Sequence, residues 1–272
     1  MTLPEKKQLL DDALNLYYNR AFIEHDPISI PHRFTQFRDI EIAGFFAALF
    51  AWGNRKTIIN KSIDLLDRMD NSPYDYIKQA NTLDLATLKT FKHRTFNGED
   101  VLGIVKTLQS IYARYDSLEE ALIVKDQDRQ VNIKENLHKL HLLFAQSPYV
   151  AKRTMRHIAS PYKKAACKRL VMYFRWMVRK DRSKVDLGLW TTIKSRQLEC
   201  PLDVHVARIA RELDLLYRKA NDWQAVEELG RALREIDAND PVKYDYALFT
   251  RPSKFYGSGH DFVWMMMDSV CA

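Results

Sequence analysis

The chain has 272 residues, a net charge of +7, 46% hydrophobic residues and 28% charged residues. This balance is typical of a globular protein with a well-buried core, and it excludes wholesale disorder. No apolar run is long enough to span a membrane, and the opening MTLPEKKQLLDD lacks an apolar signal core. We therefore expect a cytoplasmic protein without a membrane partner.

Apolar residues recur at helical spacing along the first half of the chain. The stretch from Leu9 to Ala21 predicts an amphipathic helix, and Asp39 is the predicted N-cap of a helix that ends near Trp52. Because EIAGFFAALFAW is apolar on every side, we expect that second helix to be buried at the centre. Further helices are predicted at about 58–69, 102–115 and 134–145. No segment alternates clearly enough to predict a strand.

The second half of the chain carries sharper helix signals. A helix is predicted over 163–179, with one apolar face and an opposite stripe of Lys164, Lys168, Met172, Arg175 and Arg179. Three aspartates stand where helices are predicted to begin: Asp203, Asp222 and Asp240. The tail after Arg251 is rich in aromatic residues and methionine, and we expect it to pack against the core.

The positive charge is concentrated in one segment. Between Val150 and Lys184 there are twelve Lys or Arg residues and one acid, Asp181, whereas the remaining residues are slightly negative. Such a patch is the electrostatic footprint of a polyanion, because each neutralised phosphate releases counterions. The alternative is a solvated helical face whose long side chains cover apolar surface.

Cofactor and metal motifs are missing from the sequence. The three cysteines form no CxxC pair, which argues against a disulfide framework, a zinc site and an iron–sulfur cluster. The sequence contains no Walker motif, no dinucleotide-binding fingerprint and no HExxH motif. We expect no metal and no cofactor.

The segment CPLDVHVARIARELDLL carries the most functional information. Taken alone, Asp203 is most simply a helix N-cap, and His205 is a structural histidine. The segment resembles, however, the V-D-x-H-V-x-R stretch of the helix-hairpin-helix DNA glycosylase superfamily, and especially its 8-oxoguanine branch. That resemblance implies that Asp203 is catalytic and that His205 lies at the nucleic acid.

A second stretch, IAGFFAALFAWGNRKTIINKSIDLLDRM, resembles the early helix pair of the same superfamily. The resemblance implies that Asn54 fills the gap left by a flipped base, with Arg55 beside it on the nucleic acid. The alternative is that Asn54 merely ends one helix and starts the next. The whole chain is also similar to a family of bacterial proteins of unknown function, through AGFFAALFAWGNRKTI, ACKRLVMYFRWMVRKD, VDLGLW, PLDVHVARIAREL and DPVKYDYALF.

The chain departs from the glycosylase pattern at its hairpin. The matching SPYKKAACKR has no glycine, so side chains such as Lys164 and Arg169 would have to replace the usual backbone contacts to phosphate. Lys168 matches the catalytic lysine, but it lies 35 residues before Asp203 because of the insert KDRSKVDLGLWTTIKSRQLE. In that insert Trp190 either lines a pocket or packs. Lys168 is predicted either as an amine nucleophile or as a phosphate contact.

The sequence therefore predicts an all-α, glycosylase-like fold with a degenerate hairpin and two helical subdomains beside a cleft. Residues 1–35 and 216–272 are expected to pack with 36–150, opposite 151–215. The predicted function is a base-excision DNA glycosylase, with or without lyase activity, that binds duplex DNA. The alternatives are a non-catalytic nucleic-acid-binding protein on the same scaffold and an RNA-directed relative. The predicted catalytic residues are Asp203 and Lys168, and the predicted nucleic-acid contacts are Asn54, Arg55, Lys164, Arg169, Arg175, Arg179 and His205.

Overall fold

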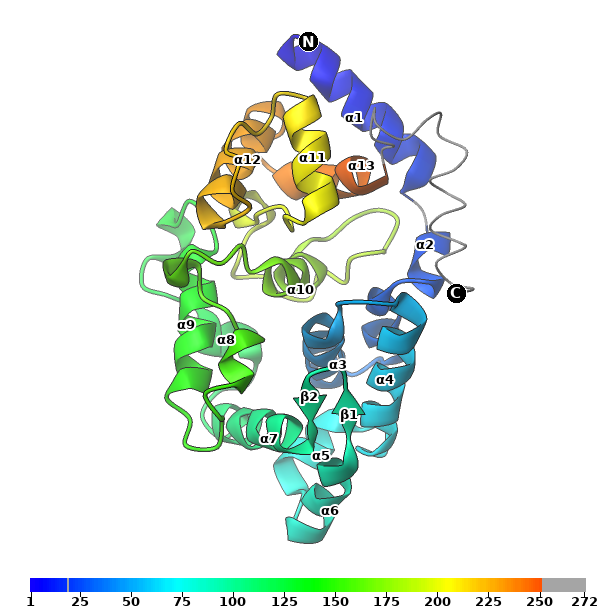
Figure 1. The fold of residues 1–272 in the computed structure, drawn as a ribbon, viewed down its shortest axis with the longest axis vertical. Coiled ribbons are helices and arrows are strands. Elements are labelled where there is room, and N and C mark those ends of the chain that lie inside the picture. Colours follow the sequence, from blue (N-terminus) through cyan, green and yellow to red (C-terminus); the bar gives the residue numbers. More distant parts are fainter. Residues whose placement is uncertain (19, 251–272) are drawn as a thin grey trace.

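The computed structural model describes residues 1–18 and 20–250, and these are mostly helical (Figure 1). The predicted packing of the tail after Arg251 lies outside the described residues. The longer helices are α1 (Leu3–Tyr17), α3 (Phe37–Phe50), α4 (Arg55–Asp67), α7 (Gly98–Tyr112), α9 (Lys134–Ala145), α10 (Lys168–Val178), α11 (Val204–Glu212) and α12 (Trp223–Ile236). The shorter ones are α2 (Ala21–Glu24), α5 (Pro73–Gln79), α6 (Thr82–Thr87), α8 (Leu118–Leu122) and α13 (Asp245–Thr250). The all-α class is confirmed.

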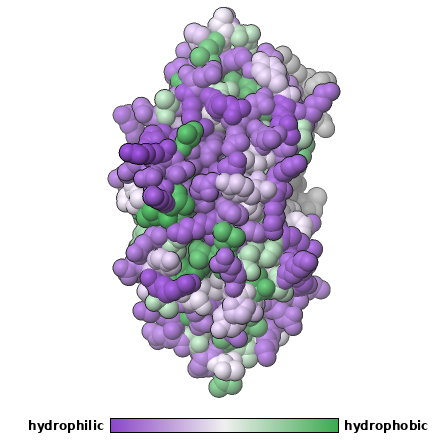
Figure 2. Space-filling model, turned by 90° about the vertical axis from the view of Figure 1, so that its left-hand side faces the viewer, coloured by the Kyte–Doolittle hydropathy of each residue, from purple (hydrophilic) through white to green (hydrophobic). Residues whose placement is uncertain are grey.

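One small hairpin was not predicted. Strands β1 (Lys92–His93) and β2 (Phe96–Asn97) pair antiparallel, and they are too short to show an alternating pattern in the sequence. Among the described residues, no helix is both long and apolar enough to cross a membrane. The face over α8, α9 and α12 is mostly hydrophilic, with hydrophobic side chains in small separate patches (Figure 2).

Helix α3 is the centre of the core, as its all-round apolar sequence predicts. Every residue from Ile40 to Phe50 is buried, and the helix packs against α10 and α4. Gly44 faces α10, where a Cβ would lie 2.7 Å from the Met177 Cε and would push the end of that side chain aside. The predicted N-cap Asp39 is wrong: the helix begins earlier, and Asp39 instead accepts a hydrogen bond from the Tyr74 amide.

A buried carboxylate on α3 ties the surrounding elements together. Glu41 accepts hydrogen bonds from the Tyr112 hydroxyl at 2.6 Å, the Leu118 amide at 2.8 Å and the Trp190 Nε1 at 2.7 Å. Burial raises the pKa of Glu41, and these three donors oppose the rise. Trp190 is therefore part of the core, and through it the insert is attached to α3.

Helix α10 lies between two groups of helices (Figure 1). The first group holds α1 and α11 to α13, in which α13 packs against both α1 and α11. The second group holds α3 to α7. The sequence predicts that residues 216–272 lie across a cleft from residues 151–215. In the structure, however, α13 from the first segment packs against α11 from the second.

The predicted helix over 163–179 is shorter than expected and is not exposed along its basic stripe. It begins at Lys168 because the residues before it include two left-handed conformations, at Lys164 (φ 61°) and Cys167 (φ 50°). Arg175 and Arg179 are buried, with only 5% and 6% exposure. The predicted contact of these two arginines with nucleic acid stays a prediction, and their burial argues against it.

Acids from the loop after α10 and from residues 240–245 hold these two arginines in the interior. Arg175 forms ion pairs with Asp186 at 3.2 Å and with Asp245. Arg179 pairs with Asp186 at 3.0 Å and with Asp240 at 2.9 Å. A buried charge requires such partners, because its desolvation penalty is otherwise uncompensated.

Candidate active site

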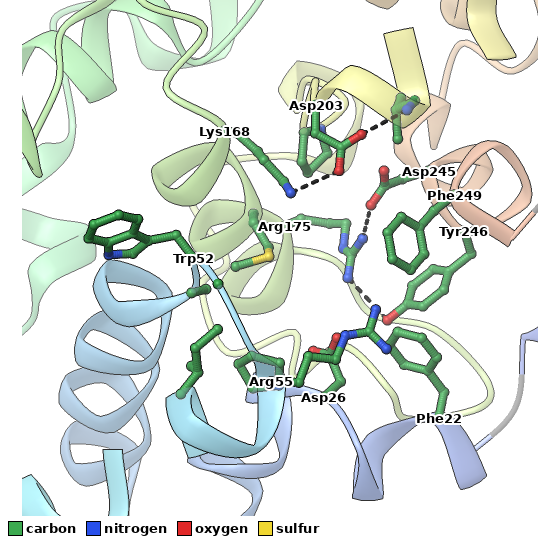
Figure 3. A pocket seen from close by; sticks show the side chains of 17 residues that line it. Phe22, Asp26, Trp52, Arg55, Lys168, Arg175, Asp203, Asp245, Tyr246 and Phe249 are labelled. Atoms are coloured by element: carbon green, nitrogen blue, oxygen red, sulfur yellow. Dashed lines mark hydrogen bonds and ion pairs between the residues drawn. The ribbon is translucent and has the colours of Figure 1, made fainter. Parts of the chain in front are cut away.

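A pocket of about 190 Å³ opens where α2, α4, α10, α11 and α13 meet (Figure 3). Its wall is both charged and aromatic. The charged side chains that line it are Asp26, Arg55, Lys168, Arg175, Asp203 and Asp245. The aromatic ones are Phe22, Trp52, Tyr246 and Phe249. Polar groups that converge in a largely apolar cavity are typical of a binding or catalytic site.

Lys168 and Asp203 meet at one edge of this pocket. The Lys168 Nζ lies 2.9 Å from the Asp203 Oδ2, and both side chains keep solvent access, with 39% and 21% exposure. Each stands at a helix start: Lys168 is the first residue of α10, and Asp203 is the N-cap of α11. The two helix starts bring together residues that are 35 positions apart in the sequence.

Asp203 is also the N-cap that its position predicts. Its Oδ1 accepts a hydrogen bond from the Val206 amide at 2.7 Å, while its Oδ2 faces Lys168. Helix α11 buries Val206, Ile209 and Ala210, which holds the cap in place. One carboxylate oxygen thus caps the helix, and the other contacts the Lys168 amine in the pocket.

Arg175 and Asp245 form a second ion pair, deeper in the same pocket. The Arg175 Nη2 also donates to the Tyr246 hydroxyl at 3.1 Å, and the Cys200 Sγ lies 3.4 Å from the Asp245 Oδ1. Figure 3 shows this pair between Lys168 and the aromatic side of the pocket. Arg175 therefore lines the pocket while its charge is already neutralised.

Asp26 and Arg55 stand on the wall opposite Lys168 (Figure 3). Asp26 is the N-cap of the short turn Pro27–Ser29, and its Oδ1 accepts from the Ile28 amide at 3.0 Å. Burial raises the pKa of Asp26, and the positive charge of Arg55 opposes the rise. Sequence reasoning missed Asp26, because it lies in the turn-rich stretch HDPISIPHRF, which carries no motif of a site.

The turn between α3 and α4 forms part of the edge of the pocket. Trp52 lines the pocket, and the Arg94 guanidinium lies 4.2 Å from the centre of its ring. Gly53 has φ of 99°, and a Cβ there would lie 2.3 Å from the Arg94 Nη1, so glycine is required. Asn54 caps α4 by accepting from the Thr57 amide at 3.1 Å. The role implied for Asn54, to fill the space that a flipped base leaves in the duplex, stays a prediction.

A family model described as "Protein of unknown function (DUF2400)" matches residues 26–252. The chain belongs to this family. The match covers the lining residues of the pocket from Asp26 to Phe249 and leaves out Phe22. No curated protein and no solved structure matches the chain.

In this DUF2400 protein two further hollows continue from the pocket. The first, about 450 Å³, shares the Ala51–Gly53 turn and Lys168 with the pocket and includes His157. The second, about 550 Å³, shares Ala159 with the first and is lined by Lys152, Arg156 and Lys163. These three exposed cations are called the basic band below. No acidic residue lines either hollow within the described part of the chain.

The remaining predicted contacts differ in their surroundings. Lys164 is exposed next to the basic band. Arg169 is half-buried beside the first hollow, where its guanidinium donates to the Leu49 carbonyl and burial lowers its pKa to about 10. His205 is half-buried on α11, with Nδ1 at 3.0 Å from the Arg208 Nη2, and it does not line the pocket.

His157 lies under the first hollow as an uncharged ring. Its imidazole stacks on Phe96 with ring centres 3.9 Å apart. Burial, together with the charges of Arg169 and Arg156, lowers the pKa of His157 to about 4. The hollow is therefore lined by a neutral imidazole together with the cations Lys168 and Arg169.

Proposed function

We propose that this protein is a base-excision DNA glycosylase with lyase activity, on a glycosylase-like helical fold. The observation that carries the proposal is the 2.9 Å contact between the Lys168 amine and the Asp203 carboxylate inside one pocket. These are the two residues that the resemblance to helix-hairpin-helix glycosylases implies as catalytic. An amine that attacks a sugar carbon must be neutral, so it needs an adjacent group that can accept its proton.

The reaction needs a carboxylate where positive charge develops. Cleavage of an N-glycosidic bond leaves positive charge on the sugar, and the Asp203 Oδ2 would stabilise it from the pocket edge. Lys168 must then lose a proton before it bonds to C1′. The Asp203 oxygen at 2.9 Å is within reach to accept that proton.

The pocket suits a single base. Its volume of about 190 Å³ is below the range of roughly 300–1,000 Å³ that holds drug-sized ligands. A base removed from the duplex stack is held by aromatic faces, and Phe22, Tyr246 and Phe249 are the aromatic side chains gathered on one side of this cavity (Figure 3). A whole nucleotide would then lie partly outside, over the neighbouring hollow that contains Lys168.

The basic band supports duplex DNA as the partner. Its three cations line the second hollow, which is connected to the pocket by the first hollow, the one that includes His157. A bound phosphate backbone would run from the basic band to the pocket. The affinity of such a surface is mainly electrostatic and independent of sequence.

Replacing Lys152, Arg156 and Lys163 together by Ala is expected to weaken duplex binding about equally for all sequences. Because each lost phosphate contact removes about 0.9 from the slope of log K against log salt, the slope should fall by up to about 2.7. Fluorescence anisotropy over a salt series measures this. The control replaces Lys78, Lys125 and Lys219, which are exposed and line none of these hollows. Equal slopes for the two triple variants would contradict the proposed DNA surface.

The enzymatic proposal is tested with duplexes that carry different lesions and with an abasic duplex, each followed by borohydride reduction. Wild-type protein should release one or more bases and form a covalent adduct with the abasic duplex. Lys168→Gln should lose the adduct and retain binding, because the amide cannot form a Schiff base. Binding without any base release would leave a non-catalytic nucleic-acid-binding protein.

An adduct that persists in Lys168→Gln would move the nucleophile to another amine. Lys164 is the amine to replace next, since it is exposed four residues earlier. A matched double variant, Lys164→Gln with Lys168→Gln, then decides whether either lysine forms the adduct. Stronger binding to RNA than to DNA would instead direct the proposal to an RNA substrate.

A further inference from the structure

The pocket holds three carboxyl groups, and two of them are engaged by cations. Asp203 pairs with Lys168 at 2.9 Å, and Asp245 pairs with Arg175. Asp26 has no cation within 4.0 Å among the described residues. Its Oδ1 accepts from the Ile28 amide at 3.0 Å, which leaves Oδ2 as the carboxyl oxygen available to the pocket.

Asp26 faces the Lys168–Asp203 pair from the other side of the cavity (Figure 3). A sugar that is placed with C1′ at Lys168 can direct its base across the pocket to the wall that carries Asp26. The two ends of one N-glycosidic bond would therefore meet two different carboxyl groups. In a two-carboxyl site, one group serves as acid and the other as electrostatic stabiliser.

Charged and titratable groups from three helices face Asp26. They are Arg55 on α4, Lys168 and Arg175 on α10, and Asp245 and Tyr246 on α13. Burial raises the pKa of Asp26 above the usual value of an aspartate, while Arg55, Arg175 and Lys168 act against the rise. A raised pKa favours the protonated form of a carboxyl group, which is the form that a general acid must have.

We propose that Asp26 is the general acid that protonates the leaving base. This inference rests on the proposed function and adds the residue that acts on the base. As the C1′–N bond breaks, its electron pair stays on the base, and the Asp26 proton moves onto the same base. The products are a neutral free base, a carboxylate on Asp26 and a sugar cation beside Asp203. Solvent returns the proton to Asp26 after the base has left.

The test uses Asp26→Asn in the full-length protein. Asn retains the oxygen that accepts from the Ile28 amide, so the turn keeps its cap and the variant should fold. Base release should fall by roughly 100- to 10,000-fold, the usual contribution of general acid catalysis. Adduct formation with an abasic duplex should be unchanged, because no base leaves in that reaction.

A pH profile of base release provides a readout that a structural role would not change. In the wild type, rising pH removes the Asp26 proton and slows base release, whereas Asp26→Asn should lose this descending limb. The inference is overturned if Asp26→Asn releases base at the wild-type rate, or if base release and the abasic adduct fall equally. If wild-type protein neither releases a base nor forms an adduct, the proposed function itself fails.

Discussion

Asp203→Asn is expected to fold with nearly wild-type stability and to lose base release by at least about 100-fold. Asn caps a helix as well as Asp, so the hydrogen bond from the Val206 amide at 2.7 Å should persist. The ion pair with Lys168 is lost, but with 39% and 21% exposure it contributes about 1 kcal/mol at most. The carboxylate charge, however, is what stabilises the sugar cation. Chemical denaturation and single-turnover base release measure the two quantities.

A matched control for this experiment is Asp222→Asn. Asp222 is the N-cap of α12, accepts from the Ala225 amide and pairs with Arg218 at 2.6 Å, but it does not line the pocket. It should keep both stability and activity. If Asp203→Asn loses both together while Asp222→Asn keeps both, Asp203 is structural and the catalytic assignment is wrong.

Helices that bury one apolar stripe were the easiest elements to predict. The segment predicted at about 134–145 is α9, Lys134–Ala145, and the caps at Asp203 and Asp222 are confirmed. These features depend on residues within one or two turns of each other, so the local sequence contains the information. Asp240 precedes a short helical turn as predicted, although its side chain binds Arg179 instead of capping.

Helix α10 was harder because its surroundings come from distant segments. A period of 3.6 residues identifies its two faces but does not show which face is covered. The apolar face packs on α3, while Asp186, Asp240 and Asp245 cover the arginines on the other side. Those acids lie between 7 and 70 positions from the arginines that they bind.

The site was predicted in part. Lys168 and Asp203 were selected by resemblance, and the structure brings them into one pocket. Asp26 and Trp52 were missed, since the residue types around them indicated only a turn and a helix end. Only the fold, which gathers these turns and residues of α10, α11 and α13 around one cavity, places these side chains in a common site.

Arg175→Met is expected to destabilise the protein by about 3–5 kcal/mol, because removal of one partner leaves buried acids uncompensated. Met has a helix propensity similar to that of Arg, so α10 itself should form. Asp245 loses its ion-pair partner, and Asp186, which is fully buried, keeps only Arg179. Urea denaturation of the variant and the wild type gives the difference in free energy of unfolding.

Lys164→Met is the surface control for this variant, because Lys164 is exposed on the segment that leads into α10. Its free energy of unfolding should stay within about 0.5 kcal/mol of wild type, whereas its affinity for duplex DNA should fall. The opposite result would be an Arg175→Met variant that is as stable as wild type but binds DNA poorly. That result would support the phosphate contact that the basic stripe of the sequence predicts for Arg175. The burial of Arg175 at 5% exposure is the reason to expect otherwise: a side chain enclosed by Asp186, Asp245 and Tyr246 stabilises the pocket wall and has no free face for phosphate.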